Sequence, residues 1–159
     1  MRVYHGATAE IRFPLVHVGR RDLDFGKGFY VTPIMEQASS WACRPANKHK
    51  EHWLNVYDID YNAVISEFHS KTFRSYNEEW LDFILSCRQG EDKWKAFDFI
   101  EGGIANDRIF STIELYTSHL ISKQEALSRL IYENPNQQMC IINQKIINQH
   151  LTFIESQKL

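Results

Sequence analysis

The chain has 159 residues, of which 43% are hydrophobic, which is enough for one globular domain with its own core. Its 18 basic and 20 acidic residues give a formal net charge of −2, which excludes the whole-chain basic field typical of non-specific nucleic-acid binders. The start of the chain lacks a basic leader with an apolar run, and no stretch approaches the roughly 18 apolar residues of a membrane span, so we expect a single cytoplasmic domain, residues 1–159, without membrane contact.

Short aromatic and β-branched runs between glycines and prolines predict the strands of the first half of the chain. These strands span residues 2–5, 28–31 and 54–61, and residues 64–68 are a further candidate. Thr32 followed by Pro33 predicts a helix that begins at Pro33 and continues through Ala42, because the missing N–H of proline costs nothing at the first helical position.

In the middle of the chain, a helix is predicted from Glu78, with Asn77 as its N-cap and Gly90 as its stop. Residues 96–100 read as a strand that continues into a turn at Gly102-Gly103.

In the last third, apolar residues recur at helical spacing over residues 109–120. Ser122 and Glu125 form a capping box that begins a second helix. Strands at residues 138–142 and 151–154 flank a short helix. The whole chain is therefore predicted to be α+β, with many short strands and helices between them.

The stretch at residues 23–32, LDFGKGFYVT, suggests two kinds of phosphate chemistry that its context excludes. Asp24-Phe25-Gly26 matches the magnesium motif of protein kinases, but a kinase needs a glycine-rich loop, a strand lysine and a catalytic loop before that motif, and the segment before Asp24 is too short to hold them. A Walker loop needs GxxxxGK[ST], which this stretch lacks. His49 and His52 have HxxH spacing without a third ligand, so we predict no metal site.

Five short motifs in a fixed order carry a family resemblance: YHG at 4–6, DFGKGFYVT at 24–32, QASSWA at 37–42, GGIAND at 102–107 and NQQMCI at 136–141. Together they resemble the ADP-ribosyltransferase superfamily, in its His-Tyr branch that includes diphtheria toxin and the poly(ADP-ribose) polymerases. More closely, the set is similar to a bacterial group of ADP-ribosyltransferase-like proteins suspected to be toxins. The resemblance implies a split antiparallel β-sheet core with flanking helices and NAD+ in the cleft between the two sheets.

The resemblance also implies roles for individual residues. His5 would hold the adenosine-side ribose or the nicotinamide, and the backbone of Gly6 would approach the nicotinamide amide. Tyr30 would stack on the nicotinamide ring, and Gly28 would let the chain pass close to the ligand. An aromatic face attracts a cationic pyridinium ring by about 0.5 to 2 kcal/mol, which gives the Tyr30 assignment a physical basis.

The catalytic glutamate of this branch is matched here by Gln138, with Gln137 one register away. A glutamine can hydrogen-bond the ribose 2'-hydroxyl, but it lacks the negative charge that stabilises an oxocarbenium-like transition state. Three outcomes stay open: an active transferase of His-Tyr-Gln type, a slow or substrate-assisted enzyme, or an NAD-binding protein without transfer. Glu101 or Asp107 could supply a carboxylate instead.

Three cations, Arg20, Arg21 and Lys27, lie in or next to the connection between the two NAD motifs. An arginine fork suits phosphate oxygens, so Arg20 is a candidate for the NAD pyrophosphate, and ordinary surface charge is the alternative.

These observations predict an NAD+-dependent ADP-ribosyltransferase that uses NAD+ as a substrate and needs no metal. Its acceptor would be a macromolecule, either protein or nucleic acid, and the resemblance implies the toxin of a bacterial toxin-antitoxin pair with a small antitoxin protein as partner. Two alternatives remain open: a non-catalytic module that binds NAD or ADP-ribose, and an NAD+ glycohydrolase with water as acceptor.

Overall fold

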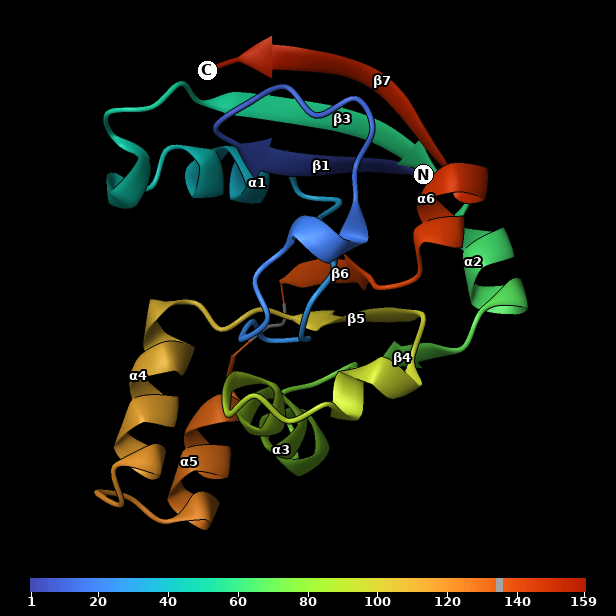
Figure 1. Cartoon of the computed structure of the whole chain (residues 1–159). Helices are drawn as coiled ribbons and strands as arrows, with labels where there is room; N and C mark the ends of the chain where they lie inside the picture. The colour runs from blue at the N-terminus through green and yellow to red at the C-terminus, as the bar shows by residue number, and fades with distance from the viewer. Residues whose placement is uncertain (134–135) are drawn as a thin grey trace.

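The computed structural model describes residues 1–133 and 136–159, and it shows an α+β fold built on two small sheets (Figure 1). The strands are β1 (Arg2–Ala7), β2 (Phe29–Val31), β3 (Trp53–Ile59), β4 (Ser70–Thr72), β5 (Phe99–Gly103), β6 (Gln137–Ile141) and β7 (Leu151–Lys158). One sheet is antiparallel with the order β1-β3-β7. The other has the order β2-β6-β5-β4, in which β4 is parallel to β5 and the other pairs are antiparallel.

The helices cover these sheets from three sides (Figure 1). Their bounds are α1 (Met35–Ala42), α2 (Tyr61–Glu67), α3 (Glu78–Arg88), α4 (Asp107–Thr117), α5 (Lys123–Leu130) and α6 (Gln144–His150), with 3-10 turns at Val16–Val18, Pro45–Asn47 and Lys93–Ala96. Helix α1 lies against β1, α2 and α6 lie together at one end, and α3 to α5 lie below the four-stranded sheet. Within the described residues, no helix combines the length and apolarity needed to cross a membrane.

The four-stranded sheet separates two layers of buried apolar side chains, because successive side chains of a strand point to opposite faces. Along β6, Met139 and Ile141 face the three-stranded sheet, whereas Cys140 faces the helices α3 to α5. The layer between the sheets includes Val3, Phe29, Val31, Tyr57, Phe99, Met139 and Ile141, and the helical layer includes Phe25, Trp80, Leu81, Ile84, Ile100, Ile109 and Leu130.

Most of the predicted elements are confirmed. The side chain of Asn77 accepts a hydrogen bond from the Trp80 N–H at 2.9 Å and caps α3, and Gly90 adopts φ +83° just beyond the end of that helix. Ser122 accepts from the Glu125 N–H at 3.1 Å, as the capping box predicts for α5.

One strand prediction and one helix prediction need correction near the two helices α2 and α1. Residues 64–68 were a candidate strand but lie mostly in α2, because Asp60 caps a helix there by accepting from the Ala63 N–H at 3.1 Å. Helix α1 begins at Met35 rather than at Pro33. The Thr32 hydroxyl accepts from the Ile34 N–H at 3.1 Å, and this bond holds the chain outside the helix until that point.

Three strand predictions also need correction. The strand expected at residues 96–100 is β5, which begins at Phe99 after a 3-10 turn, and Gly102-Gly103 are part of it rather than a turn. Strand β4 has only three residues and was not predicted from the sequence. Because a helical connection between β4 and β5 lets the two strands run parallel, the four-stranded sheet is mixed and not wholly antiparallel.

Candidate functional site

An isolated backbone bridge pairs the two sheets at Tyr4 of β1 and Thr32 just after β2. The Tyr4 N–H donates to the Thr32 carbonyl at 2.8 Å, and the Thr32 N–H donates to the Tyr4 carbonyl at 2.9 Å. Since backbone groups alternate sides along a strand, the N–H and C=O of Gly6 point to the same edge of β1 as those of Tyr4, away from β3.

Beyond this pair no backbone hydrogen bond joins β1 and β2 in the described part of the chain. An antiparallel ladder continued from Tyr4–Thr32 would place Gly6 opposite Tyr30. Within residues 1–133 and 136–159, no loop or side-chain group hydrogen-bonds to the amide or the carbonyl of Gly6. Buried backbone polar groups are nearly always paired, so a free donor and acceptor at this place mark a candidate ligand contact.

The side chain of His5 bridges the two strands where they separate. Its Nδ1 lies 2.6 Å from the Tyr30 carbonyl oxygen, so Nδ1 carries the proton that is donated, and the ring lies 4.5 Å from that of Phe29 between centroids. Burial lowers the pKa of His5, and the hydrogen bond to Tyr30 opposes this effect. The imidazole is therefore neutral at pH 7, and its Nε2 is left as an acceptor.

The ring of Tyr30 is fixed at its far end by its hydroxyl. That hydroxyl donates to the Gly26 carbonyl at 2.6 Å and accepts from the Phe25 N–H at 3.1 Å. Burial, with a smaller contribution from Cys140, raises the pKa of Tyr30 well above its usual value, so the hydroxyl stays protonated. The side chain packs against the apolar helical layer and is only partly buried, so its orientation is fixed while part of the residue stays accessible.

Both glycines of the predicted site make room for neighbouring backbone. A Cβ on Gly6 would collide with the carbonyl oxygen of Ala38 in α1, and one on Gly28 would lie 2.6 Å from the sulfur of Cys140 and from the Ile141 carbonyl oxygen. Gly28 was predicted to let the chain pass close to a ligand. In the structure it lets the chain pass close to β6 instead. The Cα of Gly6 faces α1, and its N–H and C=O point along the edge of β1 that Tyr4 uses to pair with Thr32.

The strand register distinguishes the two glutamines at the start of β6. Tyr30 pairs with Cys140, and Gln138 lies two residues before Cys140 on the same face, so Gln138 and Tyr30 are diagonal neighbours. Gln137 is exposed, and its carbonyl accepts from the Thr32 hydroxyl at 2.7 Å and from the Gln37 side-chain amide at 3.4 Å. Of the two glutamines, Gln138 shares the face of the Tyr30 ring.

Two side chains of α1 extend this region, although the sequence analysis assigned them no role. Gln37 faces the start of β6, and its Oε1 is buried without a hydrogen-bond partner among the described residues. Trp41 lies one helical turn later on the same flank, with 53% of its surface exposed. The guanidinium of Arg44 lies 4.1 Å above the Trp41 ring. The i, i+4 spacing of Gln37 and Trp41 in QASSWA was the available sequence signal.

The two alternative carboxylates lie away from this face. Glu101 is buried on β5 and accepts from the hydroxyl of Tyr61 at 2.6 Å and from that of Thr72 at 2.9 Å. It alternates with Ile100, which pairs with Cys140 on the Tyr30 side, so Glu101 points to the opposite face. Asp107 is exposed in the first turn of α4. The structure therefore brings neither carboxylate to Tyr30 and Gln138.

The other residues of the DFGKG loop are attached to the helical layer. Phe25 is fully buried, and both Nε and Nη2 of Arg88 donate to Oδ1 of Asp24, at 2.9 and 2.6 Å. Arg20 is exposed in the same connection, and Arg21 forms an exposed ion pair with Asp92 at 3.7 Å. Asp24 and Phe25 thus have a structural role, because they attach the loop to the helical layer.

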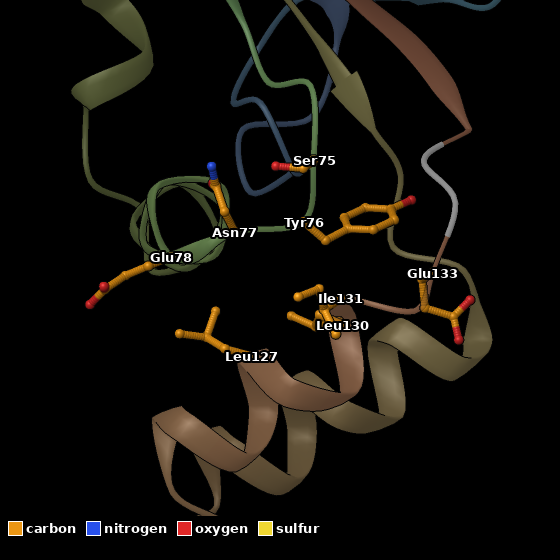
Figure 2. A pocket seen from close by; sticks show the side chains of 8 residues that line it. All are labelled: Ser75, Tyr76, Asn77, Glu78, Leu127, Leu130, Ile131 and Glu133. Carbon is orange, nitrogen blue, oxygen red and sulfur yellow. The ribbon is translucent and has the colours of Figure 1, made fainter.

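Two cavities lie outside the region of His5 and Tyr30. One of about 310 Å³ lies between the start of α3 and α5, where Leu127 and Ile131 lie below Tyr76 (Figure 2). Its lining comprises Ser75, Tyr76, Asn77, Glu78, Leu127, Leu130, Ile131 and Glu133. The other, of about 800 Å³, is a polar hollow between Asp58–Asn62 and the end of α6. Among the described residues, no three His, Cys, Asp or Glu side chains gather closely enough to hold a metal ion.

Comparison with protein families gives one match, which spans residues 1–153 and is described as a protein of unknown function (DUF3990). The chain belongs to this family. Comparisons with curated proteins and with solved structures give no significant match. The family description states no activity, so a function has to be inferred from the geometry of the site itself.

Proposed function

We propose that this protein is an NAD+-dependent ADP-ribosyltransferase that modifies a macromolecule. The observation that carries the proposal is that, among the described residues, the amide and carbonyl of Gly6 have no partner just beyond the last pair between β1 and β2, where a continued ladder would place Gly6 opposite Tyr30. The ordered motifs of the sequence support the same function independently.

The nicotinamide end of NAD+ matches these groups in both hydrogen bonding and charge. A primary carboxamide has one acceptor oxygen and an NH₂ donor, which complement the N–H and C=O of a single extended residue such as Gly6. The pyridinium is a planar cation. Trp41 already holds a planar cation, the Arg44 guanidinium, on its ring, and Tyr30 offers a second aromatic surface.

The reaction would break the bond between the pyridinium nitrogen and C1 of the ribose. The bonding electrons leave with nicotinamide, which becomes neutral, while a nucleophile of the acceptor forms the new bond to C1 and loses its proton. In this proposal Nε2 of neutral His5 accepts from a ribose hydroxyl, and the Gln138 amide hydrogen-bonds the 2'-hydroxyl next to C1. The fixed geometry would favour the oxocarbenium-like transition state.

A neutral Gln138 favours a second candidate function, a module that binds NAD or ADP-ribose without transfer, because no carboxylate stabilises the developing positive charge. NAD+ glycohydrolysis is a third candidate, in which water replaces the macromolecule. The toxin role with a small antitoxin partner rests on the sequence resemblance and belongs to the same proposal.

The experiment combines NAD+ calorimetry with a nicotinamide-release assay in the presence of cell extract as acceptor. The proposal expects binding, release, and label from NAD+ transferred to a polymer. Binding without release would overturn it in favour of the binding module. Release without any labelled polymer would identify a glycohydrolase.

Two tyrosine variants test the site. Tyr30→Ala should weaken NAD+ binding about tenfold or more and remove growth inhibition on expression, because the ring is lost. Tyr132→Ala is the matched control, since that tyrosine is 86% exposed after the end of α5, and it should bind NAD+ like the wild type. Equal NAD+ binding by both variants would remove Tyr30 from the site.

A further inference from the structure

Arg44 covers the exposed aromatic ring of Trp41 at the end of α1. Its guanidinium lies 4.1 Å above the ring of Trp41, and within the described residues no carboxylate lies at ion-pair distance from it. Its Nε is buried with no hydrogen-bond partner in the described part of the chain. A charged donor held in this way keeps its cation–π contact but lacks an acceptor for one of its N–H groups.

The backbone around Arg44 is fixed, so the side chain can move without the loop. The Arg44 carbonyl accepts from the Asn47 N–H at 2.8 Å, and the Asn47 side chain donates to the Ala42 carbonyl at 2.9 Å in a buried contact. His52 further fixes the Asn47 carbonyl at 3.0 Å. A rotation of the Arg44 side chain therefore leaves the end of α1 and the Trp41 position unchanged.

We propose that Arg44 exchanges places with the pyridinium of the dinucleotide. In the empty site the guanidinium covers Trp41; when NAD+ binds, the pyridinium takes the indole ring, and the released guanidinium binds a phosphate oxygen of the same ligand. Arg44 is thus a specificity-determining residue for ligands that carry both a planar cation and a phosphate. This inference rests on the proposed function, because it requires the dinucleotide to bind beside Trp41.

Chemical complementarity supports the direction of the exchange. A phosphate offers the guanidinium several anionic acceptors, which the indole ring does not, and the fork of an arginine suits phosphate oxygens. The pyridinium gains the aromatic contact that the guanidinium gives up. Arg44 also lies next to Trp41, whereas Arg20 lies exposed in the connection between β1 and β2, so Arg44 replaces it as the first candidate for the pyrophosphate.

The test uses ligand-detected NMR titration with two fragments of NAD+ on the full chain. N-methylnicotinamide, methylated at its ring nitrogen, carries the planar cation without the phosphates, and ADP-ribose carries the phosphates without the planar cation. In Arg44→Gln, N-methylnicotinamide should bind about threefold tighter, because its competitor for Trp41 is gone. In the same variant ADP-ribose should bind about tenfold more weakly, because a charged phosphate contact is lost.

Two further variants separate exchange from a structural effect. Arg44→Lys keeps the charge but loses the planar stack, so it should retain most ADP-ribose binding while N-methylnicotinamide still binds more tightly than to the wild type. Arg12→Gln removes an equivalent cation–π contact, 5.5 Å above Phe153, and should leave both titrations unchanged. Opposite shifts for the two fragments in Arg44→Gln would support the exchange, and shifts in the same direction, or none, would overturn it. If the wild type binds neither fragment nor NAD+, the proposed function itself fails.

Discussion

Asp24 and Tyr30 lie in the same short segment, but their polar groups are used in different ways. The Asp24 carboxylate accepts two hydrogen bonds from Arg88 and one from the Ala105 N–H at 3.4 Å, so both of its oxygens are engaged inside the protein. Tyr30 also has its hydroxyl and carbonyl bound, but its side chain is only partly buried and it lies close to the point where the pairing between β1 and β2 ends.

This difference separates an anchor from a binding surface. Asp24 holds the loop in place, because both of its carboxylate oxygens already accept hydrogen bonds from other parts of the protein. A group that is fixed at one end and open at the other can receive a ligand without reorganisation, and this is the arrangement at Gly6, His5 and Tyr30. We therefore expect a variant of Asp24 to lower stability without changing NAD+ binding. A variant of His5 or Tyr30 should mainly change NAD+ binding, and a variant of Gly6 should also change stability because its backbone packs against α1.

Gly6→Ala should produce the largest loss of stability, because the new methyl group meets the backbone of α1 and the strand cannot move away from β3. We expect the free energy of unfolding in urea to fall by about 3 kcal/mol. Gly90→Ala is the control, since its Cβ has room but its φ of +83° is strained, and it should cost about 1 kcal/mol. Equal losses in the two variants would show that α1 is not packed tightly on Gly6.

Asp24→Asn tests the anchor directly. The change leaves a partly buried Arg88 without its counterion, so the free energy of unfolding should fall by about 2 kcal/mol. Asp58→Asn breaks the exposed pair with Arg2 and should cost about 0.5 kcal/mol or less. The folded Asp24→Asn protein should bind NAD+ with wild-type affinity in calorimetry, and a large loss of affinity would break the distinction between anchor and binding surface.

His5 should make stability fall at mildly acidic pH. Its folded-state pKa is lowered mainly by burial, so below the unfolded value of about 6.5 the unfolded chain binds a proton that the folded chain does not. The contribution is complete above that pH and decreases as the pH falls, by up to about 1.4 kcal/mol per pH unit. His5→Asn keeps a donor for the Tyr30 carbonyl but cannot titrate. Urea unfolding from pH 7.5 to 5 should give a flatter profile for this variant, and parallel profiles would contradict the burial of His5.

Gln138→Glu should change stability least, by about 0.5 kcal/mol or less, because the position is only half-buried. Its effect on chemistry is the informative part. A carboxylate on the Tyr30 face should stabilise the developing positive charge and raise nicotinamide release about tenfold. Gln137→Glu is the matched control on the opposite face and should leave release unchanged. A gain in Gln137→Glu instead would show that the face assignment is wrong.

Local signals in the chain were sufficient for the elements whose ends are fixed by their own side chains. Asn77 and Ser122 cap α3 and α5 through bonds to residues three positions later, so the sequence spacing itself contains the information. Elements fixed by distant residues were not predictable in the same way. Strand β4 pairs with β5 across the intervening helix α3, and three residues leave too weak a pattern to recognise.

The candidate site shows the same division. The motifs identified His5, Tyr30 and Gln138 as residues of interest, and they could not show which face of β6 Gln138 occupies or what Gly6 and Gly28 pack against. The position of Arg44 over Trp41 was also invisible in the sequence, because a basic run after a helix usually reads as solvated surface.

The amino-acid sequence by itself determined the α+β class and the helix caps, and it singled out His5, Tyr30 and Gln138 as candidates, because these depend on side-chain type and short spacing. Only the tertiary structure decided where the pairing of β1 with β2 ends and that His5 binds the Tyr30 carbonyl at that point. That end point depends on how two sheets pack around a shared apolar layer, and contacts between residues distant in the chain set it.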